Sequence, residues 1–187
     1  MTAGFRDIRC VFLDRDGVIN RKAPEGNYIA KWGELEILPG VETAVAELNR
    51  SGRRVIVVSN QRGIALGYYT REDVEALHAQ LQKHLGEHGA LIDAFYYCPH
   101  DEGECHCRKP ATGMFEQAFR DFPGVSAANS LMIGDSLPDI AAAQALGMPS
   151  ILIAADPSRQ KAGAERAAAL ATLTAESLPA AVRRFFL

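Results

Sequence analysis

Acidic side chains follow hydrophobic segments at positions where several carboxylates could bind one cation. Asp14 and Asp16 come directly after an apolar run, and Asp135 follows another. Carboxylates two positions apart repel each other unless a cation is present, and a few carboxylates with room for water suit Mg²⁺, which attracts phosphate. Taken singly, Asp14 fits a turn and Asp135 fits a helix cap. Their combination with Ser59 and Lys109, at the ends of other segments, favours a phosphate site.

A second group of side chains has the composition of a different metal site. Three thiols and an imidazole lie within ten residues, at Cys98, His100, Cys105 and Cys107. This set can bind Zn²⁺ tetrahedrally and leaves no position open, so it predicts a structural zinc loop at residues 98–107 that directs Arg108 and Lys109 toward the phosphate. The alternative is a mobile loop with reduced cysteines. Cys10, inside an apolar run, fits a core position.

These side chains lie between segments that alternate between strand and helix patterns. Short apolar runs predict strands at residues 9–13, 54–58, 92–97, 130–133 and 150–153. Apolar spacing and capping residues predict helices at residues 41–50, 70–88, 114–122, 137–146, 162–171 and 177–186. The alternation predicts an α/β fold with a parallel sheet covered on both faces. Ligands of such sheets bind beyond the carboxyl ends of the strands, where the polar groups above are found.

The composition is that of one ordinary globular domain. The chain has 187 residues, of which 48% are hydrophobic and 23% charged, so we expect a single domain over residues 1–187. A net charge of −3 argues against a nucleic-acid or acidic-membrane partner. No apolar run reaches the roughly 18 residues of a membrane span, and residues 1–7 contain no apolar signal core. These features favour a cytoplasmic protein, and we expect a monomer.

Four polar segments resemble the four ordered motifs of the haloacid dehalogenase superfamily of phosphatases. They are Asp14–Asn20, Ser59–Gln61, Arg108–Pro110 and Gly134–Asp139. The resemblance implies a three-layer, doubly wound parallel sheet of the Rossmann-like type. It also implies a Mg²⁺-dependent phosphatase that hydrolyses phosphoric monoesters through an aspartyl-phosphate.

The resemblance also implies roles within these motifs. Asp14 would attack phosphorus, and Asp16 would protonate the leaving oxygen and later take a proton from water. Mg²⁺ would bind the Asp14 carboxylate, the backbone carbonyl of Asp16, and Asp135. Ser59 and Lys109 would hold phosphoryl oxygens.

The zinc loop narrows the resemblance to a cap-less branch, the D-glycero-D-manno-heptose 1,7-bisphosphate 7-phosphatases and histidinol phosphatases. In this branch only loops cover the site, which implies substrate-facing flaps at residues 21–32 and 61–69. Arg108 would bind the distal part of the substrate, where a second phosphate suits an arginine. The entrance would be lined by Asn60, Gln61 and Arg62.

Several alternatives stay open from the sequence. Asp139 would orient Lys109 or a metal-bound water, but residues 136–139 equally fit a helix capping box. Arg62 and Arg108 favour a sugar bisphosphate over histidinol phosphate as the substrate. The bisphosphate implies a place in nucleotide-activated heptose and lipopolysaccharide synthesis. The negative net charge disfavours a polynucleotide 3′-phosphate. A zinc-stabilised binding module without catalysis would be expected to lack a catalytic carboxylate, and all are present.

Overall fold

The protein contains one six-stranded parallel sheet with the strand order β3-β2-β1-β4-β5-β6. The computed structural model describes residues 5, 7–24, 26–154 and 163–186. The strands are β1 (Cys10–Leu13), β2 (Arg54–Asn60), β3 (Ala94–Cys98), β4 (Ser130–Gly134), β5 (Ser150–Ile153) and β6 (Leu173–Ala175). β1 lies in the middle, with Cys10 in register with Arg54 of β2 and Ser130 of β4. The chain therefore leaves β1 toward one edge of the sheet and later returns to build the other edge.

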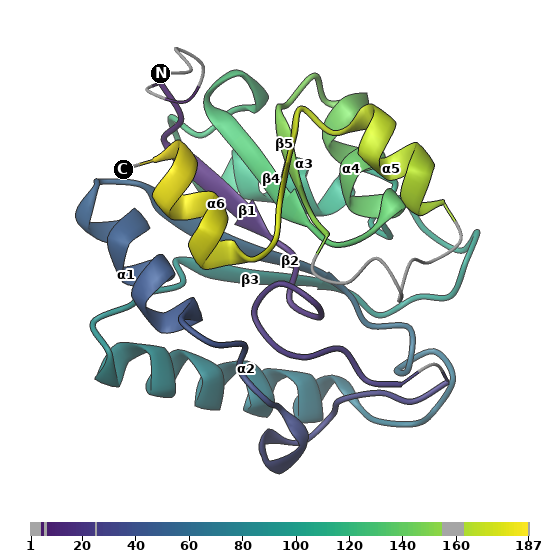
Figure 1. Ribbon diagram of the computed structural model, residues 1–187. Helices are drawn as coiled ribbons and strands as arrows, with labels where there is room; N and C mark the ends of the chain where they lie inside the picture. Colours follow the sequence, from purple (N-terminus) through teal and green to yellow (C-terminus); the bar gives the residue numbers. More distant parts are fainter. Residues whose placement is uncertain (1–4, 6, 25, 155–162, 187) are drawn as a thin grey trace.

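Helices cover both faces of this sheet, as Figure 1 shows. They are α1 (Val41–Arg50), α2 (Arg71–Glu87), α3 (Gly113–Asp121), α4 (Leu137–Ala145), α5 (Ala164–Leu170) and α6 (Leu178–Phe185), with short 3-10 helices η1 (Trp32–Glu34) and η2 (Ala127–Asn129). Side chains alternate along β1, so Val11 and Leu13 pack with α1, α2 and α6, while Cys10 and Phe12 pack with α3 and α4. The expected three-layer, doubly wound architecture is confirmed.

The expected strands and helices are found with boundaries within two residues of those expected, and one strand at the carboxyl-terminal edge of the sheet was not expected. β6 was not predicted, because it has only three residues and none of them is buried, so it lacks the apolar run that marks the other strands. It pairs in parallel with β5. The expected helix at 162–171 is found as α5, and its expected first residue, 162, lies outside the described residues.

The connections that leave the site edge carry little regular structure. Between β1 and α1 the described residues form only η1, and between β2 and α2 they form no helix or strand. These connections contain the expected flaps at 21–32, of which residue 25 is not described, and at 61–69. The flaps contact each other where the Tyr28 ring stacks on Tyr68 with centroids 5.2 Å apart. Among the described helices, none combines the length and apolarity that crossing a membrane requires.

Candidate active site

The centre of the candidate site is a buried lysine between two buried aspartates. Lys109 Nζ lies 2.9 Å from Asp14 Oδ1 and 2.6 Å from Asp139 Oδ1, and it donates a hydrogen bond to the Val58 carbonyl at 2.6 Å. Burial lowers the pKa of Lys109, but the attraction of Asp139 and Asp14 outweighs burial and raises it. Lys109 is therefore a fixed positive charge at the carboxyl end of the sheet.

Asp14 extends from the end of β1, where its backbone N–H donates to the Ile133 carbonyl of β4 at 3.0 Å. The pKa of Asp14 is raised, because burial disfavours its charge more strongly than Lys109 favours it, and Asp139 adds repulsion. One positive charge thus does not fully offset the acids gathered here. A further cation would favour the ionised form of Asp14.

A divalent cation fits the carboxylates at this edge of the sheet. Oxygens of Asp14, Asp135 and Asp139 all lie within 4.8 Å of one another, and such hard oxygen donors suit Mg²⁺. Gly17 keeps the space open, because a Cβ on it would collide with the Asp135 carboxylate. Lys22, from the first flap, lies 3.2 Å from both carboxylate oxygens of Asp135.

Asp16 is held by an arginine to which the sequence analysis assigned no role. Arg15 Nη2 donates to both Asp16 oxygens, at 3.0 and 2.9 Å, and also to the Ile29 carbonyl in the first flap at 3.3 Å. Asn20 donates to Asp16 Oδ1 at 2.9 Å, and Gln61 donates to Oδ2 at 3.3 Å. Burial raises the pKa of Asp16, but the Arg15 charge and the hydrogen bonds from Asn20 and Arg15 outweigh it, so the pKa is lowered.

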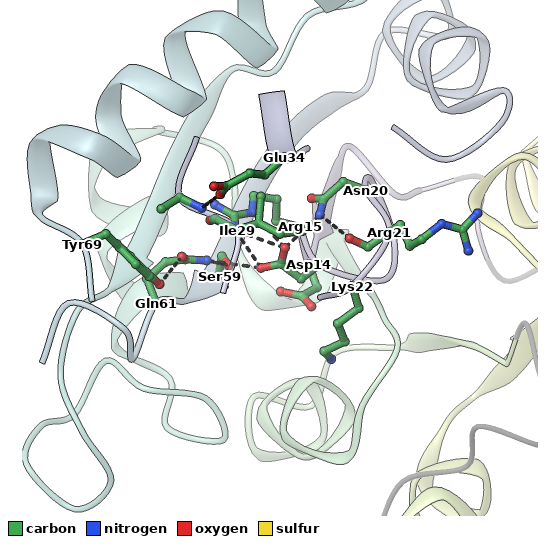
Figure 2. Close-up of polar contacts among 12 residues, drawn as sticks. Asp14, Arg15, Asn20, Arg21, Lys22, Ile29, Glu34, Ser59, Gln61 and Tyr69 are labelled. Atoms are coloured by element: carbon green, nitrogen blue, oxygen red, sulfur yellow. Dashed lines mark hydrogen bonds and ion pairs between the residues drawn. The ribbon is translucent and has the colours of Figure 1, made fainter. Parts of the chain in front are cut away.

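A chain of hydrogen bonds fixes the serine at the end of β2. Tyr69 donates to Gln61 Oε1 at 2.8 Å, and Gln61 Nε2 donates to Ser59 Oγ at 2.7 Å (Figure 2). Gln61 was expected at the entrance, but it is 2% exposed and lies inside the site, because it connects Ser59 to the second flap. Tyr69 was not predicted. Gly63 marks its place, since a Cβ there would collide with the Tyr69 ring.

Asn60 connects β2 to the segment that carries the lysine. Its Nδ2 donates to the Lys109 carbonyl at 3.0 Å, and its Oδ1 accepts from the Lys109 backbone N–H at 3.0 Å. The Asn60 side-chain amide thus pairs with the Lys109 backbone through one donated and one accepted hydrogen bond, as the backbone of a neighbouring strand would. It fixes the backbone from which the Lys109 side chain reaches Asp14.

The two arginines expected to face the substrate both lie next to acids of the 98–107 loop. Arg62 Nη2 donates to Asp101 Oδ2 at 3.2 Å, and Arg108 Nη2 lies 3.7 Å from Glu102 Oε1. The Arg108 side chain is 18% exposed and that of Arg62 is 40% exposed. The arginines and these acids together form a charged rim beside the buried centre.

The predicted zinc ligands lie together. Cys98 Sγ lies 3.0 Å from Cys107 Sγ and 3.4 Å from Cys105 Sγ, and His100 Nδ1 lies 3.4 Å from Cys107 Sγ. A tetrahedral site with zinc–sulfur bonds of about 2.3 Å has sulfur–sulfur edges of about 3.8 Å, so small shifts would accommodate the ion.

The three thiols of this cluster differ in their electrostatics, because burial raises the pKa of Cys98 and of Cys107, whereas the pKa of Cys105 is lowered. Burial raises the pKa of Cys105, but hydrogen bonds from Cys107 and from backbone N–H groups outweigh it and lower the pKa to about 6. One of these N–H groups belongs to Arg108, 3.4 Å from Cys105 Sγ. The cluster is thereby joined to the segment that carries Lys109.

Comparisons with known proteins show that this chain is similar to phosphatases. A family model described as HAD-hydrolase-like matches residues 106–181. The D-glycero-alpha-D-manno-heptose-1,7-bisphosphate 7-phosphatase of Mycobacterium bovis is 41% identical over 132 residues, which are 70% of this chain and 69% of that protein. The D-glycero-beta-D-manno-heptose-1,7-bisphosphate 7-phosphatase of Vibrio cholerae is 37% identical over 176 residues, covering 90% and 91%.

A solved structure agrees over nearly the whole chain. It is the D,D-heptose 1,7-bisphosphate phosphatase of B. bronchiseptica, complexed with magnesium and phosphate. The TM-score is 0.81 at 29% identity, and the match covers 95% of this chain and 97% of that one.

Proposed function

Because the chain belongs to the haloacid dehalogenase superfamily of phosphatases, in the branch of the heptose 1,7-bisphosphate 7-phosphatases, we propose that it removes the 7-phosphate of D-glycero-D-manno-heptose 1,7-bisphosphate. It is a phosphoric monoester hydrolase. The observation that carries the proposal is the buried group of Asp14, Lys109 and Asp139 at the carboxyl end of β1, where an entering phosphoryl group would meet both a carboxylate and a cation.

Asp14 is the proposed nucleophile. Its carboxylate oxygen bonds to phosphorus while the bond from phosphorus to the sugar oxygen breaks, which leaves an aspartyl-phosphate. Water then attacks this phosphorus, releases inorganic phosphate and restores Asp14. Lys109 and Ser59 would hold the phosphoryl oxygens, and both side chains are fixed before substrate arrives, by Asp139 and by Gln61 respectively.

Asp16 is the proposed acid and base. It gives a proton to the leaving sugar oxygen in the first step and takes one from the attacking water in the second. Arg15 favours the ionised form of Asp16, so a proton has to reach the carboxyl before the ester bond breaks. An entering phosphate favours that uptake, because its negative charge repels the ionised carboxylate and so raises the pKa of Asp16.

Two metal ions complete the proposed enzyme. Mg²⁺ would be held by the carboxylates of Asp14 and Asp135 with the backbone carbonyl of Asp16, and it supplies positive charge that offsets the phosphoryl oxygens. Zn²⁺ would be held by the four ligands of the 98–107 loop in a structural role. The loop would thereby support the backbone of Lys109 through the bond from Arg108 to Cys105.

The charged rim supports a substrate with a second anionic group. Arg108 and Arg62 lie at this rim. The forked donors of an arginine match two oxygens of a phosphate, whereas its positive charge repels the ammonium of histidinol phosphate. The substrate-binding roles of Asn60, Gln61, Arg62 and Arg108 remain predictions. So do a single domain over residues 1–187, a monomeric state, a cytoplasmic location and a role in lipopolysaccharide synthesis.

The test is phosphate release with Mg²⁺ from the α and β anomers of the heptose bisphosphate and from histidinol phosphate. We expect kcat/KM to be highest for one of the bisphosphates, with release stopping after one phosphate. Asp14→Asn should abolish turnover, because an amide cannot form the acyl phosphate. Full turnover by that variant would overturn the nucleophile assignment, and preference for histidinol phosphate would overturn the substrate.

A further inference from the structure

Three metal-ligating side chains lie together away from both sites described above. Glu42 is in the first turn of α1, His84 is in the last turn of α2, and His88 follows α2 directly. A donor atom from each lies within 4.8 Å of the other two. Glu42 Oε1 and His84 Nε2 are 3.1 Å apart. In tetrahedral sites with metal–ligand bonds of about 2.0–2.1 Å, ligand atoms lie about 3.3 Å apart, so this spacing already suits a shared ion.

The ring of the second histidine is fixed through one of its two nitrogens. His88 Nδ1 lies 2.9 Å from the His84 carbonyl, and a carbonyl only accepts, so Nδ1 carries the proton. In the neutral ring this leaves the Nε2 lone pair available. Metal-bound histidines commonly have their other ring nitrogen fixed by such a bond. His84 and His88 are four positions apart on one helix face, with ring centroids 4.7 Å apart.

A simple ion pair explains only part of this arrangement. Glu42 beside His84 suits the ends of two helices, since a carboxylate is favoured at a helix start and a cation near a helix end. That explanation does not require the nearby ring of His88 or its fixed tautomer. A bound metal ion would account for all three side chains together.

We propose that Glu42, His84 and His88 form a second transition-metal site, which takes a borderline dication such as Zn²⁺ or Ni²⁺ with water completing the coordination. This site joins α1 to α2 on the face of the sheet that they cover together. Its effect is on stability, because an ion that binds only the folded chain shifts the unfolding equilibrium. It is independent of the phosphatase chemistry.

The chain contains its own reporter for the test. Trp32 is the only tryptophan, and its ring centroid lies 5.7 Å from that of His84. The zinc-loaded protein, dialysed free of excess metal, would be titrated with Ni²⁺ while Trp32 fluorescence and bound nickel are measured. Because the carboxylates of the proposed Mg²⁺ site can also take Ni²⁺, we expect two additional equivalents in the wild type, of which only one quenches Trp32 and only that one is lost in His88→Ala. A concentration a hundred times the Kd should raise the Tm by about 5–10 °C.

Variants separate this site from the zinc loop, which stays unchanged in all of them. His88→Ala alters an exposed residue and should weaken nickel binding at least ten-fold, and Glu42→Gln should do the same. Glu72→Gln is the matched control, because Glu72 is an exposed acid in the first turn of α2, and it should leave binding unchanged. Equal stoichiometry and equal quenching in wild type and His88→Ala would overturn the proposal, as would an absence of quenching in the wild type.

Discussion

Asp139 uses its two oxygens for different contacts, and Asp139→Asn would reveal how much each contributes. Oδ2 accepts hydrogen bonds from the backbone and hydroxyl of Ser136, at 3.1 and 2.5 Å, in the capping box of α4. Oδ1 lies 2.6 Å from Lys109 Nζ. Asparagine keeps the shape but removes the charge beside the lysine and weakens the cap.

The capping box of α2 provides a matched control for the loss at the cap. Asp73 Oδ2 accepts from the backbone and hydroxyl of Thr70, at 2.8 and 3.1 Å, at the surface. Losing a cap costs about 0.5–2 kcal/mol of unfolding free energy. Breaking a buried ion pair costs about 3–5 kcal/mol, and the Lys109 and Asp139 side chains are only 2% and 1% exposed. Because Asp14 still partners Lys109, we take the lower end and expect Asp139→Asn to cost about 3 kcal/mol more than Asp73→Asn.

The assay is urea unfolding of both variants and wild type at neutral pH, with zinc present and magnesium absent. For a chain of this length the extra loss corresponds to a Tm about 6–12 °C lower for Asp139→Asn than for Asp73→Asn. Phosphate release should fall in kcat only for Asp139→Asn, because only this variant loosens Lys109. Equal losses of unfolding free energy in the two variants would show that the ion pair adds nothing to the cap, and the reasoning would be wrong.

Three further predictions concern Asp16, the magnesium site and zinc. Arg15→Met should raise the pKa of Asp16, so the basic limb of kcat/KM moves to higher pH. Arg21→Met, at the exposed pair with a glutamate, should leave the pH profile unchanged. Gly17→Ala, whose Cβ would collide with a carboxylate of the magnesium site, should raise the Mg²⁺ concentration for half-maximal activity at least ten-fold; Gly26→Ala, also at positive φ but in open space, should not. Removing zinc by chelation should lower Tm and kcat together, and added zinc should restore both; an unchanged kcat would separate the loop from Lys109.

The position of the site could be predicted because it depends on short-range rules. Asp14, Ser59 and Asp135 each follow or end a strand, and parallel strands bring such ends to one edge of the sheet. From the sequence, Asp139 could be either a helix-capping residue or a partner of Lys109. The structure shows both contacts at once.

Other features depend on packing that no local pattern encodes. Arg15 lies inside a recognised motif, yet the sequence does not show that its side chain binds Asp16. In the structure the same Arg15 nitrogen also donates to the Ile29 carbonyl of the first flap, which is distant in sequence. Gln61 follows a strand end, where exposure is the usual expectation, but it is buried and accepts a hydrogen bond from the Tyr69 hydroxyl. The pair of Glu42 and His84 is separated by 42 positions and requires two helices to meet.

The central position of β1 has a consequence for how such an enzyme can change. Asp14, the proposed nucleophile, follows the strand at which the sheet changes its direction of winding, and strands pair with β1 on both sides. The crossovers that carry the flaps extend from this frame, and Tyr28 of the first flap contacts the rings of both Tyr68 and Tyr69 in the second. Because the flaps also carry the Ile29 carbonyl and Gln61, which hold Arg15 and Ser59, a longer flap could admit new substrates with the chemistry intact only where it keeps those two contacts.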